Sequence, residues 1–148
     1  MAITSTPPSP RSIRGRAVTV TDVEELLPEA DRDFLSAAGY DHTIERVGQQ
    51  VHVVIRNFPL PRYKPQNADL LIIVPSGYPN AKLDMFWTFP DVFLPNGGIP
   101  VKADVHEQHG GRNWQRWSRH IADGKWRPGV DNLRSYMTTV KTELAKGR

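Results

Sequence analysis

The sequence predicts a single α+β domain with a helix near each end and an antiparallel sheet between them. Three observations predict this class. A chain of 148 residues suits one hydrophobic core. Strand-like runs separated by short turns fill its middle, and its C-terminal segment carries a helical apolar stripe. We expect the folded domain to span residues 21–148, after a basic, Pro/Ser-rich tail over residues 1–20.

The first helix is expected between Pro28 and Gly39. Proline suits the first turn of a helix, acidic residues favour its positive end, and glycine is a natural stop. Four strand-like runs follow, over residues 41–47, 51–57, 68–74 and 83–88. The short Gly-Gln-Gln turn between the first two runs predicts a hairpin. The middle of the chain is therefore expected to form a four-stranded antiparallel meander.

Residues 89–113 show no regular period and are rich in proline and glycine, so we expect a long irregular segment with at most a short strand over 101–105. Loops of this length are often functional. Trp114, Trp117 and Ile121 then follow at helical spacing. In the last helix Asp131 is the expected cap. Its expected apolar stripe consists of Leu133, Tyr136, Met137, Val140 and Leu144.

Charge and composition exclude several classes of function. Arg11, Arg14 and Arg16 account for the whole net charge of +3, so the rest of the chain carries 16 basic and 16 acidic residues. A nucleic-acid-binding domain usually has a basic folded face, and no nucleic-acid partner is expected. Without cysteine the chain cannot perform thiol chemistry. It contains no membrane-length apolar run or signal peptide, so we expect a cytoplasmic protein with a disordered tail.

Three motifs, in this order of elements, resemble the ubiquitin-conjugating enzyme (UBC) superfamily over residues 22–145. Residues 75–80, PSGYPN, are similar to the family's Pro-x-x-Tyr-Pro turn into the fourth strand. Residues 94–96, Leu-Pro-Asn, are similar to its His-Pro-Asn tripeptide with the histidine replaced. Residues 125–128, Lys-Trp-Arg-Pro, are similar to the Trp-x-Pro that precedes a helix. Together with the segment Trp-Ser-Arg-His, they most resemble a bacterial branch called prokaryotic family E.

In that branch, UBC-like proteins occur beside ubiquitin-like proteins, an activating (adenylating) enzyme and a JAB-type peptidase. The resemblance implies that this chain accepts a ubiquitin-like protein from an activating enzyme, without a cofactor. The chain departs from the family twice: the segment between Asn96 and Ser118 is longer than its counterpart, and the catalytic cysteine is missing. In the family the nucleophile lies about eight residues before the Trp-x-Pro tryptophan. Counting back eight residues from Trp126 gives Ser118.

Ser118 is therefore the candidate nucleophile of an acyl transferase that uses serine in place of cysteine. A hydroxyl can carry an acyl group as an oxyester, but it needs a base to activate it. His120 is the candidate base, because side chains two residues apart share a side of an extended segment. His106 or His109 could reach in from the long loop instead. By resemblance, Asn96 would hold the oxyanion or order its loop.

Other interpretations stay open from the sequence. The chain could be a catalytically inactive UBC-fold scaffold that binds the ubiquitin-like protein or the activating enzyme. Ser118 could reflect a different register or an introduced replacement of cysteine. A hydrolase could hold zinc with His106, His109 and His120, since catalytic zinc sites use three protein ligands. The first two of these histidines lack the helical spacing of the HExxH motif, and no metal site is assigned.

Overall fold

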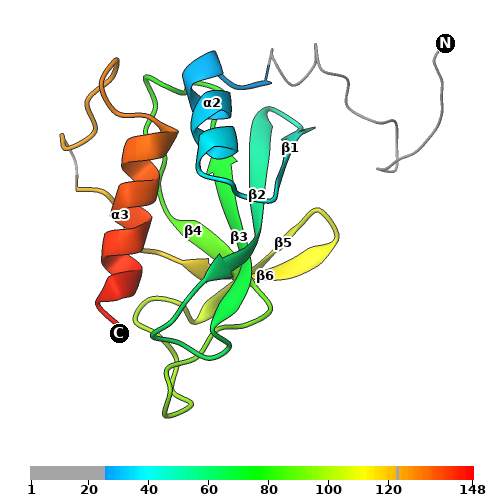
Figure 1. Cartoon of the computed structure of the whole chain (residues 1–148), viewed down its shortest axis with the longest axis vertical. Helices are drawn as coiled ribbons and strands as arrows, with labels where there is room; N and C mark the ends of the chain where they lie inside the picture. Colours follow the sequence, from blue (N-terminus) through cyan, green and yellow to red (C-terminus); the bar gives the residue numbers. More distant parts are fainter. Residues whose placement is uncertain (1–25, 123) are drawn as a thin grey trace, which may run out of the picture.

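The computed structural model describes residues 26–122 and 124–148 (Figure 1). The expectations for the tail over residues 1–20 lie outside these residues. The elements follow one another as α2 (Glu29–Ala37), β1 (His42–Val47), β2 (Gln50–Pro59), β3 (Asn67–Val74), β4 (Phe86–Phe89), β5 (Val105–His109), β6 (Arg112–Trp117) and α3 (Leu133–Ala145). In the described part of the chain, neither helix combines the length and the apolar character that a membrane crossing needs.

The strands form one sheet in the order β1-β2-β3-β4-β6-β5, and all neighbouring pairs are antiparallel (Figure 1). The α+β class with a helix near each end is confirmed. Within the described residues, however, the sheet has six strands where the sequence predicted four. The two additional strands come from residues after β4, which return to pair with β4 through β6. The end of the long segment, from Val105 onward, is thus part of the sheet, whereas residues 90–104 are irregular as expected.

The helical spacing of Trp114, Trp117 and Ile121 does not correspond to a helix, because residues 112–117 form strand β6. β5 and β6 make a hairpin around Gly110 and Gly111, whose φ angles are 57° and 82°. Glycine adopts positive φ without steric cost, which explains its use in this turn. Trp117 packs into the main core and Trp114 into a second cluster on the other face. A strand separates residues three apart onto opposite faces, whereas a helix would bring them together.

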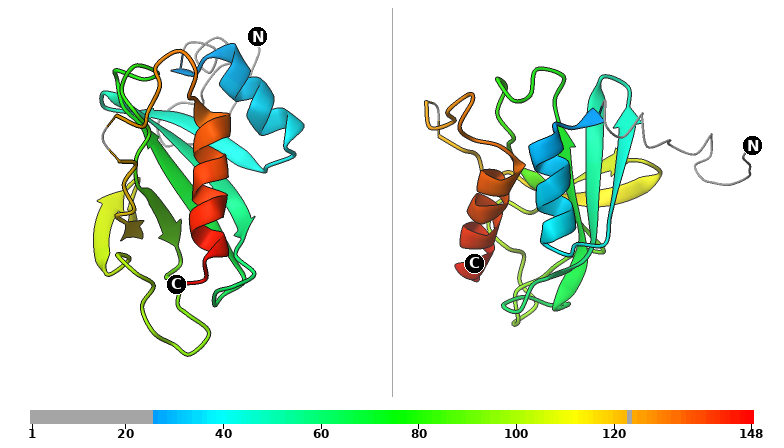
Figure 2. Two further views of the ribbon diagram at one scale, coloured as in Figure 1. Left: turned by 90° about the vertical axis from the view of Figure 1, so that its left-hand side faces the viewer. Right: turned by 45° about the horizontal axis from the view of Figure 1, so that its top comes forward.

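Both helices lie on one face of the sheet, and the main core fills the space between them (Figure 2). Helix α3 buries the apolar stripe that the sequence predicted: Leu133, Tyr136, Met137, Val140 and Leu144. From the sheet, Trp117 is fully buried and stacks on Phe86 with 5.2 Å between ring centroids. Large aromatic side chains bury the most apolar surface and dominate such a core. Trp117 is thereby fixed, and it directly precedes the candidate nucleophile.

Helix α3 has a different cap from the one predicted. Asn132, and not Asp131, is the N-cap: its Oδ1 accepts a hydrogen bond from the Ser135 backbone N–H at 3.1 Å. In return, Ser135 Oγ accepts from the Asn132 N–H at 2.9 Å, which completes a capping box. The Asp131 carboxylate accepts from the Arg127 backbone N–H at 2.7 Å instead. Asparagine and aspartate are about equally good caps, so the sequence could not separate these neighbours.

A buried carboxyl group connects α2 to α3. Asp31 is 2% exposed and accepts hydrogen bonds from the Tyr78 hydroxyl at 2.6 Å and the Leu133 backbone N–H at 3.3 Å. Burial raises the pKa of Asp31, although these two hydrogen bonds oppose the rise. Burial and the neighbouring carboxyl also raise the pKa of Tyr78. Asp31 thus fixes the PSGYPN turn, which contains Tyr78, against both helices.

The face of the sheet away from α2 and α3, here called the outer face, carries a smaller apolar cluster of Leu71, Trp87 and Trp114. His52 is 5% exposed, and its ring meets the ring of His109 edge-on with 5.6 Å between centroids. The Nε2 atom of His52 has no hydrogen-bond partner in the described residues. Such a side chain is tolerated in the neutral form and resists protonation.

We expect acid to destabilise the fold through His52. Burial, and to a smaller degree the charge of His109, lowers the pKa of His52 from 6.5 to about 4. Between these values the unfolded chain binds a proton that the folded chain does not. The free energy of unfolding should therefore be highest above pH 6.5 and fall by up to about 3 kcal/mol as the pH drops to about 4. Urea unfolding at several pH values should show that the free energy of unfolding depends less on pH in His52→Phe than in the wild type. An equal pH dependence in the two proteins would contradict the role of His52.

Candidate functional site

Ser118 lies directly after β6 and is anchored by its backbone. Its N–H donates to the Lys102 carbonyl oxygen at 2.9 Å, which joins it to the end of the preceding loop. Its partly exposed side chain shares a side of the strand with Arg116, two residues earlier. Arg116 Nε donates to Ser118 Oγ at 2.9 Å. The candidate nucleophilic oxygen is therefore in contact with a permanent positive charge.

Glu107 holds Arg116 in this position. The Arg116 Nη1 atom lies 2.6 Å from one carboxylate oxygen of Glu107. The other oxygen accepts from Trp87 Nε1 at 2.9 Å and lies 3.1 Å from His109 Nε2. Burial by itself raises the pKa of Glu107, but these hydrogen bonds and the charge of Arg116 lower it overall. Glu107 is thus ionised at neutral pH and fixes the guanidinium beside Ser118.

His120, the predicted base, is held by Asp84 on the segment before β4. Its Nδ1 lies 2.7 Å from one carboxylate oxygen of Asp84, and the other oxygen accepts from the Ile121 backbone N–H at 2.8 Å. When Nδ1 donates to the carboxylate, Nε2 keeps its lone pair and can accept a proton. The His120 side chain is 55% exposed. No hydrogen bond joins Ser118 to His120 or to another described histidine.

The two alternative bases lie on opposite faces of the β5–β6 hairpin. His106 Nε2 lies 2.9 Å from an oxygen of Asp91, whereas His109 Nε2 lies next to Glu107. Each of the three histidines considered from the sequence therefore faces a different carboxylate, and they do not meet in one site. Within residues 26–122 and 124–148, no three His, Cys, Asp or Glu side chains are arranged to hold a metal ion.

Asn96 shapes its own loop. Its Oδ1 accepts from the Gly98 N–H at 2.8 Å, while Leu94 closes the turn through backbone hydrogen bonds of 2.8 Å to both glycines that follow Asn96. Gly97 has a φ of 89°, which favours glycine. No hydrogen bond joins Asn96 to Ser118 in the part of the chain that the structure describes. The amide oxygen is occupied by this turn, and the oxyanion role of Asn96 remains a prediction.

Gln115 holds the loop that leads to Ser118, and sequence reasoning missed it. Its side chain is 1% exposed. Its Oε1 accepts from Thr88 Oγ1 and the Val92 N–H, both at 2.8 Å. Its Nε2 donates to the carbonyl oxygens of Val92 at 3.0 Å and Ala103 at 3.1 Å. All four hydrogen-bonding positions of the amide are filled, so one side chain fixes both ends of the segment between β4 and β5.

Two of the three motifs that resemble the UBC family, PSGYPN and Lys-Trp-Arg-Pro, contact each other. The Tyr78 ring lies 6.4 Å from the Trp126 ring, and Trp126 Nε1 donates to the Pro79 carbonyl oxygen at 2.9 Å. This contact fixes the end of the segment that starts at Ser118. Ser118 and Trp126, which are eight positions apart, are therefore each anchored by a hydrogen bond.

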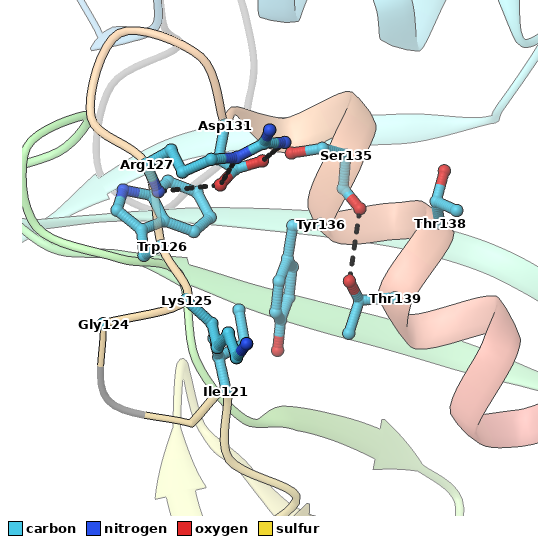
Figure 3. A pocket seen from close by; sticks show the side chains of 10 residues that line it. All are labelled: Ile121, Gly124, Lys125, Trp126, Arg127, Asp131, Ser135, Tyr136, Thr138 and Thr139. Carbon is cyan, nitrogen blue, oxygen red and sulfur yellow. Dashed lines mark hydrogen bonds and ion pairs between the residues drawn. The ribbon is translucent and has the colours of Figure 1, made fainter.

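An open pocket of about 740 Å³ lies between helix α3 and a segment that contributes Ile121, residues 124–127 and Asp131 (Figure 3). The helix side of the pocket carries hydroxyl groups, from Ser135, Thr138 and Thr139. Ile121 lines the other side (Figure 3). Because its N–H donates to Asp84, the pocket begins directly beside the His120–Asp84 pair. The structure thus has a hydroxyl in contact with a fixed cation at Ser118, and a histidine–carboxylate pair with an adjoining pocket that begins two residues later.

Comparison with known proteins agrees with the motifs. Residues 27–147 match the family described as prokaryotic E2 family E. The chain belongs to prokaryotic E2 family E. The resemblance noted from the sequence is therefore confirmed, and the protein is E2-like, a component of a ubiquitin-like system. No curated protein and no solved structure matches this chain. Because this family E protein has no cysteine, any acyl transfer by it needs another nucleophile.

Proposed function

We propose that this E2-like protein accepts the C-terminal acyl group of a ubiquitin-like protein from an activating enzyme and carries it as an oxyester on Ser118. The observation that carries the proposal is the set of groups around the Ser118 hydroxyl. The hydroxyl is partly exposed, it contacts the Arg116 guanidinium, and a histidine–carboxylate pair follows two residues later. A serine nucleophile needs a base for its proton and positive charge for the developing anion.

In the proposed step, Ser118 Oγ attacks the carbonyl carbon of the acyl group, and the bond from that carbon to the activating enzyme breaks. His120 takes the hydroxyl proton at Nε2, while Asp84 keeps the proton on Nδ1, as the carboxylate does in a catalytic triad. The proton then passes to the leaving group of the activating enzyme. Catalytic hydrogen bonds often form fully only when the substrate is bound, which reconciles this role with the free protein.

In onward transfer to an amine, the same histidine acts as a general acid instead of a base. An amine attacks the ester carbonyl, and Ser118 must leave with a proton, because an alkoxide is a poor leaving group. His120 in its protonated form supplies that proton, which is general acid catalysis worth about 10²–10⁴-fold in rate.

We propose that the pocket beside His120 takes the C-terminal tail of the ubiquitin-like protein. Its size and its position next to Asp84 support this role.

The test is reconstitution with the activating enzyme of the same system, its ubiquitin-like protein and ATP, followed by intact-mass spectrometry. We expect an adduct that lacks one water relative to the two separate proteins. It should survive thiols but be cleaved by hydroxylamine or alkali, as an ester is. Peptide mapping should place it on Ser118. Absence of the adduct, with an activating enzyme that demonstrably adenylates its ubiquitin-like protein, would contradict the proposal.

A second function has an observation of its own. The Ser118 hydroxyl accepts from Arg116 and, in the part of the chain that the structure describes, bonds to no histidine, which also suits a purely structural serine. In that case the domain is an inactive scaffold that binds the ubiquitin-like protein or the activating enzyme. The scaffold function predicts co-elution with a partner in size-exclusion chromatography without a change in covalent mass. Mass spectrometry of the co-eluting fraction separates the two functions.

A further inference from the structure

We infer that Arg116, held in place by Glu107, is a catalytic residue that activates Ser118 by stabilising the negative charge that develops on its oxygen. The inference rests on the proposed function and adds the group that offsets the weak nucleophilicity of serine. No sequence motif pointed to Arg116. It follows from a direct contact of 2.9 Å between Arg116 Nε and Ser118 Oγ.

The guanidinium contacts its two partners through different edges. Ser118 accepts from Nε, whereas Glu107 binds Nη1 at 2.6 Å. The carboxylate therefore fixes the orientation of the arginine without occupying the edge that faces the hydroxyl. Arginine stays protonated at all relevant pH values, so the charge beside Ser118 is permanent. The hydroxyl accepts from Arg116 through a lone pair, which leaves its own proton for a base.

Glu107 is the positioning residue in this arrangement. It is fixed from three sides, by Arg116, by Trp87 Nε1 at 2.9 Å and by His109 at 3.1 Å. The side chains of Arg116 and Glu107 are 27% and 32% exposed. Solvent therefore screens the charge on Arg116 less than it would screen that of a fully exposed side chain.

The chemistry explains why a serine needs this cation more than a cysteine does. An isolated thiol ionises near pH 8.5, whereas a serine hydroxyl stays un-ionised at neutral pH and is a weak nucleophile unless assisted. A cation within hydrogen-bond distance favours the anionic form of its neighbour. During attack Arg116 stabilises the charge on Oγ, and during onward transfer it stabilises the same charge as Ser118 leaves. The contact thus compensates for a nucleophile that lacks sulfur.

The pKa of a single cysteine placed at position 118 can report the electrostatic effect of Arg116 directly. The chain has no cysteine of its own, so Ser118→Cys carries one thiol at the site. The pH dependence of its alkylation by iodoacetamide gives the pKa of that thiol. We expect a midpoint about one unit below the ordinary value of about 8.5, and a return toward that value in Ser118→Cys/Arg116→Gln. This measurement needs no partner protein.

Arg112 provides the matched control. It lies on the same strand and pairs with Asp69 at 2.8 Å, but its hydrogen bonds do not reach Ser118. Ser118→Cys/Arg112→Gln should keep the midpoint of Ser118→Cys. Equal midpoints for the Arg116→Gln and Arg112→Gln variants would overturn the role of Arg116. Circular dichroism spectra that match the wild type would establish that each variant is folded.

Transfer kinetics give a second and separate readout. Arg116→Gln should slow oxyester formation on Ser118 by about 100-fold, whereas in the Ser118→Cys background it should slow thioester formation by less than about tenfold. Arg116→Lys keeps the charge and should restore part of the loss. An Arg116→Gln protein that forms the oxyester at the wild-type rate would overturn the inference and leave the proposed function intact. No adduct in the wild type would instead refute the proposed function, while the thiol midpoints still decide whether Arg116 acts on position 118.

Discussion

Ser118→Ala should abolish the covalent adduct with the ubiquitin-like protein, a loss of at least about 10³-fold in adduct yield, and leave the fold unchanged. The hydroxyl is the only group removed and it is partly exposed. Among the described residues its side-chain hydrogen bond is with Arg116, which Glu107 still holds. Surface substitutions of this kind usually change stability by less than about 0.5 kcal/mol. Intact-mass spectrometry measures the adduct, and size-exclusion chromatography measures non-covalent binding of the partner.

Ser118→Cys is the positive counterpart, because it should yield an adduct at the same position that thiols cleave. Ser76→Ala is the matched control: Ser76 is also exposed, and its loss should leave the adduct unchanged. An adduct that survives Ser118→Ala would show that another residue accepts the acyl group. That result would also remove the basis for assigning His120 as the base.

The elements that the sequence predicted well are those whose local pattern agrees with their environment. Strands β2 and β3 are rich in β-branched and aliphatic residues and lie in the middle of the sheet. Helix α3 has a complete apolar stripe on one side. The spacing of apolar residues along such a segment indicates both its secondary structure and the side that is buried. These segments can therefore be recognised before the fold is known.

Strands β5 and β6 were missed because their pattern is weak on its own. Most of β5 is polar, since one side of the hairpin faces solvent and the other carries Glu107 and His109. In β6, Trp114 and Trp117 happen to fall at helical spacing, although each fills a different cluster. The pairing of β6 with β4 decides between the two interpretations, and this long-range contact has no local signature.

Because strands β5 and β6 were not predicted, most of the candidate site was not predicted either. Motif spacing identified Ser118 and, two residues on, His120. The Arg116–Ser118 contact requires an extended chain, because side chains two residues apart point to the same side of a strand but not of a helix. Asp84 lies 36 residues before His120, so their pairing depends on the complete fold. Residues that act through tertiary contacts were therefore beyond the reach of sequence reasoning.

Gln115→Met should destabilise the fold by about 3–5 kcal/mol, which is a large share of the stability of a domain of this size. Methionine has nearly the shape of glutamine, so the substitution removes the hydrogen bonds without opening a large cavity. It leaves the Val92 N–H and the carbonyl oxygens of Val92 and Ala103 without their side-chain partner. Each buried polar group that loses its partner costs about 1–3 kcal/mol.

Gln108→Met tests whether this effect comes from burial of the amide. Gln108 lies on β5 and is exposed, so the same chemical change should alter stability by less than about 0.5 kcal/mol. Urea unfolding of both variants gives the two free energies, and a difference below about 1 kcal/mol between them would contradict the role of Gln115.

Because Gln115 anchors the loop whose Lys102 carbonyl binds the backbone of Ser118, Gln115→Met should also slow adduct formation even where the protein remains folded. Loss of stability at an unchanged rate would mean that the loop does not position the nucleophile.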